Sequence, residues 1–580
     1  MIKKVLLSIF LIAISSLLFF LLRGGLFSYG SQSSILNLAL DNSFDSLDPA
    51  KAYSDDSLLV SAQVLEPLYQ YHYLKRPYEI QPLLAEDLPS YSENGKILTI
   101  KLKPDVVFHP HASFKGQKRF LKAEDFVTQI KRLSLKSLNS PSKSLFSGLI
   151  KGFDTFGDLV GDDWRKIPLN KMEGVEALDD LTLKLSLTRS EPNMIYYLAL
   201  NFIVPLPWEI IESEKNNLDH VLIGTGPYQH KGFKNKYFEL MKFNEYRKDF
   251  YPTSGDRYAN MENLLDSSKQ KIPFIEYVRF HVTSQEDERW ELFGRREIDL
   301  ITVPKTFIPK LYNESGDLSE EFKERNIILK HFPILANRWL AFNMRHPLVG
   351  KNLNLRKAIA YGINYERYIE LLSQNTNLRA NSILVPGITG YQPAKEFRFN
   401  YDLGLARDYL KKAGYLSKNE MPEIIYSTRG NQAIHLKEAE FIKQQLELIG
   451  LKVKIEILTF TDFIKKGRAG ELMFFTDNWL FDYPDGENII QLLVSKNFPG
   501  VNKAGYSNKH VDELYAKLKQ TTNLDRRFKI FQEIEEQVWS DLCWIPMMYE
   551  SSFVLQYPEI KNFRKSSIIR NYVKYLKIEE

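Results

Sequence analysis

The alternation of helix and strand patterns between residues 402 and 457 constrains the fold of this chain more than any other sequence feature. Two apolar stripes at helical spacing each end at a glycine. The stripes are Leu403, Ala406, Leu410 and Ala413 before Gly414, and Ala439, Ile442, Leu446 and Ile449 before Gly450. Asp402 is placed to cap the first helix, and after Gly450 the apolar residues alternate from Leu451 to Ile457, as in a strand. Helices joined to strands through glycine caps are typical of an α/β fold.

The first half of the chain carries the same mixture of patterns. Apolar residues alternate over 97–102 and again over 181–187, which predicts two strands. Between them, Phe126 and Ile130 share one face of a helix that we predict over 123–133. We therefore expect the α/β class for the whole body of the protein.

The length of the chain indicates more than one domain. A chain of 580 residues exceeds what one hydrophobic core supports, so two or three domains are expected. No repeat, low-complexity segment or long linker divides the sequence, which favours lobes joined by short hinged crossings. The only cysteine, Cys543, cannot form an internal disulfide, so the fold must be stabilised by its core.

The charge distribution excludes a nucleic-acid-binding surface. The net charge is +5, but Lys3, Lys4 and Arg23 lie in the first thirty residues, which contain no acid, so the remainder carries only +2. A nearly neutral body lacks the basic patch that nucleic-acid binding requires. We expect no nucleic-acid partner.

Residues 1–30 have the layout of an export signal. Two lysines precede an apolar run from Val5 to Leu22, and Ser28-Tyr29-Gly30 offers small residues for cleavage after Gly30. The run is longer than most signal-peptide cores and close to the minimum for a membrane-spanning helix, so a cleaved signal peptide and a retained N-terminal anchor both stay open. Either one places the body in the periplasm or cell envelope. A lipoprotein anchor is excluded because no cysteine lies near the signal.

Catalytic and metal motifs are absent or incomplete. The sequence has no G-x-S-x-G elbow, H-E-x-x-H helix, phosphate-binding loop or G-x-G-x-x-G turn. His109 and His111 lack a third metal ligand at suitable spacing. Asp482 and Asp485 could act as an acid–base pair, but carboxylates three apart are common, and Cys543 beside Trp544 is typical of a core thiol. We expect no enzyme, metal or cofactor.

Short motifs in a fixed order resemble one protein family over nearly all of the chain. The motifs in the first half are Leu47-Asp48-Pro49, Val64-Leu65-Glu66-Pro67-Leu68-Tyr69, Gln81-Pro82-Leu83-Leu84-Ala85-Glu86 and Gly224-Thr225-Gly226-Pro227-Tyr228. Those in the second half are Leu340-Ala341-Phe342-Asn343-Met344, Leu355-Arg356-Lys357-Ala358-Ile359 and Asn478-Trp479-Leu480-Phe481-Asp482-Tyr483-Pro484-Asp485. Their order and spacing resemble bacterial extracellular solute-binding protein family 5, the oligopeptide-, dipeptide- and nickel-binding proteins of ABC importers. Among these, the oligopeptide-binding proteins are the most similar.

The resemblance implies a periplasmic-binding-protein fold with two lobes, a hinge and three domains. Lobe I would be discontinuous and comprise residues 31–68, 173–306 and 555–580. Domain II would be an insertion over 69–172, and lobe III would comprise 307–554. The implied function is capture of short peptides by a monomer that delivers them to the membrane permease of an ABC importer.

The resemblance also implies a binding site between the lobes. In the family a peptide is held as an added strand, so main-chain hydrogen bonds give affinity without reading side chains. The matching positions are Tyr53, Ser54 and Asp55 on lobe I, and Asn478, Trp479 and Leu480 on lobe III. Asp482 matches the acid that pairs with the ligand's α-ammonium group. The alternatives are a turn or cap role for Asp482 and core packing for Trp479.

The sequence departs from the family pattern at three places. Residues 473–476 contain no arginine for the ligand's carboxylate, Gly486-Glu487 follows the second aspartate where a proline is usual, and the loop over 109–122 is long and basic. Other solutes therefore stay open: a nickel chelate, heme or a cell-wall muropeptide. A membrane-anchored peptide sensor without a transport role and an acid–base hydrolase using Asp482 and Asp485 are the remaining rivals.

Overall fold

The computed structural model describes residues 34–40, 44, 46–234, 237–313, 315–393, 396–416 and 421–579. The expected signal peptide or anchor in residues 1–30 lies outside these residues. Among the helices described, none combines the length and apolar character needed to cross a bilayer.

The start, the middle and the end of the chain meet in one hydrophobic core. Its four-stranded sheet has the order β1 (Ile35–Leu40), β12 (Tyr277–Val282), β9 (Tyr237–Lys242) and β8 (Tyr228–Lys234). β1 pairs with β12 in parallel, and its alternate residues Leu36, Leu38 and Leu40 are buried. The C-terminal strands β20 (Ile560–Lys561) and β21 (Lys577–Ile578) contribute Ile560 to the same core, and α2 (Asp55–Ser61) contributes Val60. These segments are those expected to form lobe I.

A second sheet belongs to the segment expected to form domain II. Its order is β4 (Ser90–Ser92), β5 (Ile97–Lys101), β7 (Thr182–Ser186) and β6 (Val175–Asp179). The helices that pack with it are α3 (Ala123–Leu133) and α5 (Phe153–Val160), which share one hydrophobic core with β5 and β7. Because β5 pairs with β7, a domain boundary drawn on this sheet would lie after Ser186 rather than at 172. The division into domains stays a prediction.

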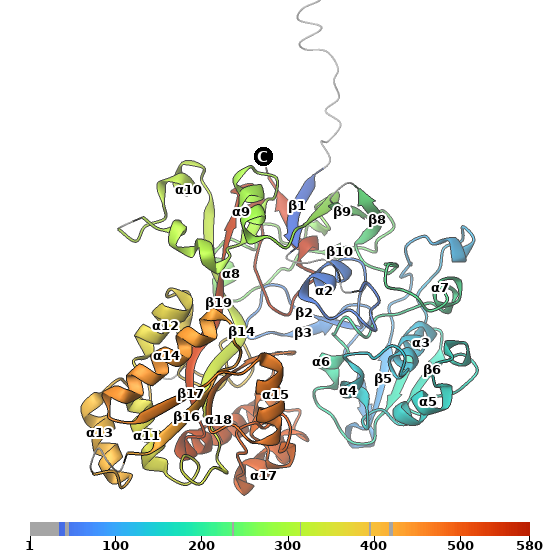
Figure 1. The fold of residues 1–580 in the computed structure, drawn as a ribbon. Coiled ribbons are helices and arrows are strands. Elements are labelled where there is room, and N and C mark those ends of the chain that lie inside the picture. Colours follow the sequence, from blue (N-terminus) through green and yellow to red (C-terminus); the bar gives the residue numbers. More distant parts are fainter. Residues whose placement is uncertain are drawn as a thin grey trace, which may run out of the picture.

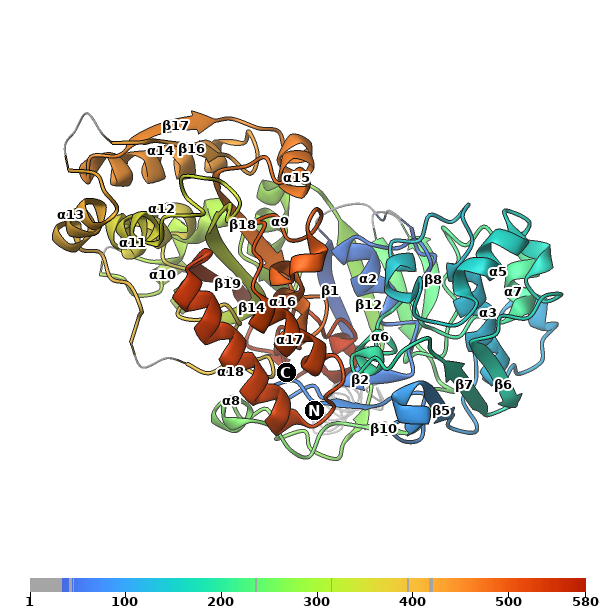
Figure 2. The same cartoon turned by 90° about the horizontal axis from the view of Figure 1, so that it is seen from below.

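The largest sheet is mixed and lies mainly in the segment expected to form lobe III. Its strands are β13 (Leu300–Thr302), β19 (Trp544–Gln556), β14 (Ile328–Phe342), β18 (Phe474–Leu480), β16 (Glu423–Ser427) and β17 (Lys452–Glu456), with β15 (Leu378–Arg379) paired to β19. Further helices are α11 (Leu353–Gly362), α12 (Tyr365–Ser373), α13 (Leu403–Lys412), α14 (Ala433–Leu448), α15 (Phe460–Ala469), α17 (Lys509–Leu518) and α18 (Leu524–Asp541). Figures 1 and 2 show α11, α13 and α14 on the opposite side of the molecule from α3 and α5. This mixture of sheets and helices confirms the predicted α/β class.

Two long antiparallel strands connect the first core to the third. β14 contributes Phe332 to the core around β1 and Leu340 to the core around α11, and β19 contributes Val554 and Ile545 to the same two cores. The register between β14 and β19 shifts between Pro333 and Asn337, which interrupts the ladder midway. Such a bulge bends a strand locally, so the crossing is suited to act as a hinge.

Candidate functional site

A cavity of about 430 Å³ lies where lobe I meets the crossing strands. It is lined by residues of β1, α2, α9 (Glu286–Gly294), β13, β14, β18, β19 and the C-terminal segment. The polar and charged lining residues are Asp55, Asp56, Arg289, Thr302, Glu550, Ser552, Lys565, Ser566, Ser567 and Arg570. Asp55 of α2 and Leu480 of β18 line the same cavity from the two lobes. Its volume lies within the range of about 300–1,000 Å³ that is usual for small-ligand sites.

Part of one edge of β18 has no partner strand in the described part of the chain. On one edge of β18, β14 pairs with the whole strand. On the other edge, β16 pairs with β18 only at Phe474 and Phe475. The N–H of Phe481 donates to the carbonyl of Leu335 at 2.9 Å. Because backbone polar groups alternate sides along a strand, those of Asn478 and Leu480 point to the edge away from β14. An open strand edge of this kind can accept a peptide strand.

The lobe I residues of the expected site lie at the start of α2. Ser54 is the N-cap, and its hydroxyl accepts a hydrogen bond from the backbone N–H of Ser57 at 3.2 Å. Asp55 occupies the first turn of the helix, where its charge is favourable to the helix dipole. Tyr53 precedes the cap with 66% of its surface exposed. Of these three residues only Asp55 lines the cavity.

Asn488, which the sequence did not indicate, ties Trp479 to Asp482. Its side-chain oxygen accepts hydrogen bonds from Trp479 Nε1 at 2.7 Å and from the backbone N–H of Asp482 at 3.2 Å. Its amide nitrogen donates to the carboxylate of Asp482 at 3.3 Å. Asn488 is itself buried. The indole ring of Trp479 and the carboxylate of Asp482 are therefore both hydrogen-bonded to one amide.

The carboxyl group of Asp482 is desolvated. Asp482 as a whole residue is exposed, but the protein around its carboxyl group removes water from it and so raises its pKa. The hydrogen bond from Asn488 and the positive charge of Arg570 act in the opposite direction. Neither Asp482 nor Asn478 or Trp479 belongs to the cavity lining. A positive charge that approached Asp482 would favour its ionised form.

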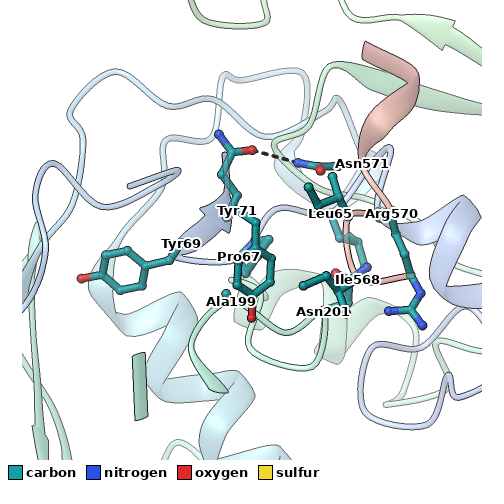
Figure 3. Close-up of a pocket in the computed structure, with 12 residues that line it drawn as sticks. Leu65, Pro67, Tyr69, Tyr71, Ala199, Asn201, Ile568, Arg570 and Asn571 are labelled. Atoms are coloured by element: carbon teal, nitrogen blue, oxygen red, sulfur yellow. Dashed lines mark hydrogen bonds between the residues drawn. The ribbon is translucent and has the colours of Figure 1, made fainter. Parts of the chain in front are cut away.

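Arg570 is a second charged residue that the sequence did not indicate. Its guanidinium donates to Asp55 across 2.8 Å, and it lines the same cavity. It also borders a smaller neighbouring cavity of about 30 Å³ (Figure 3), where Asn571 donates to Gln70 at 2.9 Å. Arg570 and Asp55 are 515 residues apart, so no local pattern could have paired them.

The other candidate groups have structural partners. His109 is buried, its Nε2 lies 2.9 Å from the carbonyl oxygen of Gly226, and burial lowers its pKa to about 4. Asp485 is buried against Arg527 at 2.6 Å, and burial raises the pKa of the Cys543 thiol. Over the ranges that the structure describes, no three His, Cys, Asp or Glu side chains gather as a metal site.

The sequence matches known solute-binding proteins over most of its length. It is 24% identical over 513 residues to heme-binding protein A of Haemophilus influenzae, covering 87% of this chain and 85% of the relative. It is 23% identical over 518 residues to the dipeptide-binding protein of Escherichia coli, with 86% of each chain covered.

The fold matches solved structures of the same kind. HbpA2 from Haemophilus parasuis superposes with a TM-score of 0.77 at 21% identity, covering 94% of this chain and 100% of that chain. MppA, a periplasmic murein tripeptide binding protein in an unliganded open form, superposes with a TM-score of 0.74 at 19% identity, covering 94% and 98%. The expected periplasmic-binding-protein fold is thereby confirmed. Residues 79–500 match the profile described as bacterial extracellular solute-binding proteins, family 5 Middle. The chain belongs to the bacterial extracellular solute-binding proteins of family 5.

Proposed function

We propose that this protein captures short peptides outside the cytoplasm and delivers them to the permease of an ABC importer, without catalysing a reaction. The observation that carries the proposal is the cavity shared by Asp55 and Leu480, beside an open edge of β18. An extended peptide needs main-chain partners on one side and room for side chains on the other, and this arrangement offers both.

The binding residues that we propose are those expected from the sequence. The carbonyl of Asn478 and the main chain of Leu480 would bond to the peptide from the edge of β18, since the N–H of Asn478 donates to the Asp477 carboxylate at 3.0 Å. Trp479 would pack on the peptide, and Tyr53, Ser54 and Asp55 would close the site at the start of α2. Asp482 would pair with the α-ammonium group of the peptide. An ammonium that enters a closed site needs an opposite charge, because burying an unpaired charge is costly.

The charge of the lining favours a ligand with both a positive and a negative end. The acids are Asp55, Asp56 and Glu550, and the bases are Arg289, Lys565 and Arg570. A balanced set of this kind suits a zwitterionic peptide better than a ligand of one sign.

A heme or nickel-chelate solute is the second candidate, because one relative is named as a heme-binding protein. The described lining residues include no histidine, cysteine or methionine, and Tyr572 is a lining side chain of a type that can ligate heme iron. Peptide therefore fits the lining better than a ligand whose metal needs a histidine, cysteine or methionine bond.

The identity of the solute can be tested directly on the isolated protein. Native mass spectrometry of the purified protein would show peptide masses released on denaturation, and calorimetry with tri-alanine would show micromolar or tighter binding. Heme titration followed by absorbance serves as the competing arm. Binding of heme or a nickel chelate without any binding of peptides would overturn the proposal.

A further inference from the structure

Glu550 brings a carboxylate to the cavity at the point where the crossing strands are irregular. It belongs to β19 and lines the cavity beside Pro333 of β14. The ladder between the two strands is interrupted here, because Pro333 pairs with Ser551 whereas the next pair in register is Asn337 with Tyr549. Glu550 therefore lies at the bulge, and 26% of its side chain is exposed.

The arginine that pairs with Glu550 is shared with a buried acid. Nη2 of Arg338 lies 3.8 Å from Oε1 of Glu550, whereas its Nη1 donates to Oε2 of Glu438 at 3.4 Å. The side chain of Glu438 is 2% exposed, and it also accepts a hydrogen bond from the hydroxyl of Tyr368. Because 3.8 Å is too long for a hydrogen bond, Arg338 is bound more closely to Glu438 than to Glu550.

Sharing one arginine leaves this group of side chains with an excess negative charge. Two carboxylates face one guanidinium, so one negative charge is uncompensated when His435, whose Nδ1 lies 4.0 Å from Glu438, is neutral. A buried carboxylate depends on its partner cation, because an unpaired charge in the interior is costly. Glu550 is thus the member of the group that can present its charge to a ligand in the cavity.

The other cations of the cavity wall are bonded elsewhere. Their contacts are Arg570 with Asp55 at 2.8 Å, Lys565 with the hydroxyl of Thr302 at 2.6 Å, and Arg289 with the carbonyl of Thr283 at 2.9 Å. In the part of the chain that the structure describes, Arg338 is the one basic residue paired with Glu550. A ligand cation at Glu550 would therefore complete a charge pair that the protein leaves half-formed.

The place of Glu550 in the sheet suits a side chain of the ligand rather than its backbone. β14 lies between β18 and β19. Neighbouring strands are about 4.8 Å apart, so β18 and β19 are separated by roughly 10 Å. A peptide bonded to the outer edge of β18 cannot bring its main chain to β19. A long side chain can cross that distance, because Leu480 of β18 and Glu550 line the same cavity.

We propose that Glu550 is a specificity-determining residue, which pairs with a cationic side chain of the bound peptide, so that the site prefers peptides containing lysine or arginine. The inference rests on the proposed peptide-binding function and deepens it by naming a class of ligand. The α-ammonium group is left to Asp482, so the two acids recognise two different charges of the peptide.

Calorimetry with matched tripeptides at pH 7 tests this preference. Tri-alanine with lysine at its first, second or third position is compared with the peptide that carries norleucine there, which has nearly the same aliphatic chain without the charge. At the position that faces Glu550, the wild type should bind the lysine peptide about tenfold more tightly, the scale of one charge-assisted hydrogen bond. In Glu550→Gln, which keeps the size of the side chain, the ratio of the two affinities should fall to about one.

Glu239→Gln is the matched control. Glu239 is also a strand residue paired with an arginine, Arg279 at 2.8 Å, but it belongs to β9 and lies outside the cavity lining. This variant should keep the wild-type ratio. Thermal unfolding checks that each variant is folded. If Glu550→Gln does not fold, a crystal structure of the wild type with the preferred lysine peptide decides, since the lysine Nζ must lie within hydrogen-bonding distance of Glu550.

The outcomes separate the inference from the proposed function. A preference for lysine that disappears in Glu550→Gln and persists in Glu239→Gln supports the inference. Equal binding of lysine and norleucine peptides by the wild type at all three positions, or a preference that survives in Glu550→Gln, overturns it while peptide binding stands. If the wild type binds none of these peptides and no tri-alanine, the proposed function itself fails.

Discussion

Asp482 is the residue on which the proposed recognition of a peptide N-terminus depends. Replacing it with asparagine keeps the side chain's size and its contact with Asn488 while removing the charge. We expect Asp482→Asn to weaken binding of peptides with free N-termini about tenfold to a hundredfold, since a hydrogen bond to a charged group contributes about 1.5–3 kcal/mol.

Calorimetry with free and N-acetylated tripeptides measures this effect. Wild type should prefer the free peptide, and Asp482→Asn should bind both alike. An equal loss of affinity for both peptides would show that Asp482 supports the fold of the site rather than the ammonium.

The raised pKa of Asp482 gives a second prediction at the residue scale. Burial raises the pKa of the Asp482 carboxyl above its ordinary value, so the group keeps its proton up to a higher pH. A bound ammonium has the opposite effect, because it favours the ionised form. Peptide binding should therefore release a proton from the protein at a pH near the raised pKa of Asp482, and affinity should fall as the pH drops through that pKa.

The raised pKa of Asp482 also determines how this residue's contribution to folding stability changes with pH. Because the folded-state pKa lies above the unfolded one, the stability that Asp482 contributes is present below the ordinary value of 3.8 and is lost as the pH rises through the raised pKa.

Calorimetry of peptide binding in two buffers of different ionisation enthalpy measures the number of protons that the protein releases on binding. Proton uptake by the protein on binding would contradict the assigned role.

At the scale of elements, the open edge of β18 allows a test of main-chain recognition. The N–H of Leu480 points away from β14, so Leu480→Pro removes a donor at the ligand edge while the pairing with β14 is kept. We expect peptide affinity to fall about five- to tenfold, the scale of one main-chain hydrogen bond. The matched control is Leu480→Ala, which truncates the same cavity-lining side chain but keeps the N–H, so it should bind more tightly than Leu480→Pro.

The comparison of these two variants by calorimetry, with unfolding in urea as a check of the fold, separates backbone from side-chain effects. Equal binding by Leu480→Pro and Leu480→Ala would mean that the edge of β18 does not hold the peptide backbone.

Local patterns predicted several elements well. The helix expected over 123–133 is α3, and the expected cap Asp402 accepts a hydrogen bond from the backbone N–H of Leu405 at 2.8 Å. α14 begins at Ala433, six residues before its apolar stripe, because its first turns carry the exposed Ile434 and Leu436 instead of a continuous stripe. Periodicity reports the buried face of a helix, so it misses turns that project into solvent.

The candidate site could be proposed from the sequence only where a family motif carries it. Asn478–Asp482 could be named because its residues are contiguous, and its role stays a prediction, whereas the sequence did not indicate Arg570 or Asn488. Arg570 reaches Asp55 through the packing of the C-terminal segment on β1 and α2, and the contact of Asn488 with Trp479 depends on the turn between β18 and the short helix α16 (Glu487–Ile490). Such contacts follow from tertiary packing and leave no spacing signature.

At the scale of the whole molecule, the proposed function requires the crossing strands to couple ligand binding to lobe movement. Pro333 and Ile334, at the register shift of β14, line the cavity, as do Glu550 and Ser552 of β19. A ligand in the cavity therefore touches the hinge itself and would favour one angle between the lobes, provided that it binds that arrangement more tightly.

Peptide should therefore stabilise and compact the protein. At a peptide concentration of a hundred times Kd, binding to the folded state alone raises the free energy of unfolding by about 2.7 kcal/mol. Urea unfolding with and without tri-alanine checks the stability, and small-angle scattering checks that the radius of gyration falls. Stabilisation with no change of radius would show binding without closure.

The most direct test is a crystal structure of the protein grown with tri-alanine. We predict an extended peptide between α2 and β18, with main-chain hydrogen bonds to Asn478 and Leu480 and its ammonium group against Asp482. A peptide bound elsewhere, or one that makes no main-chain bond to β18, would contradict the account.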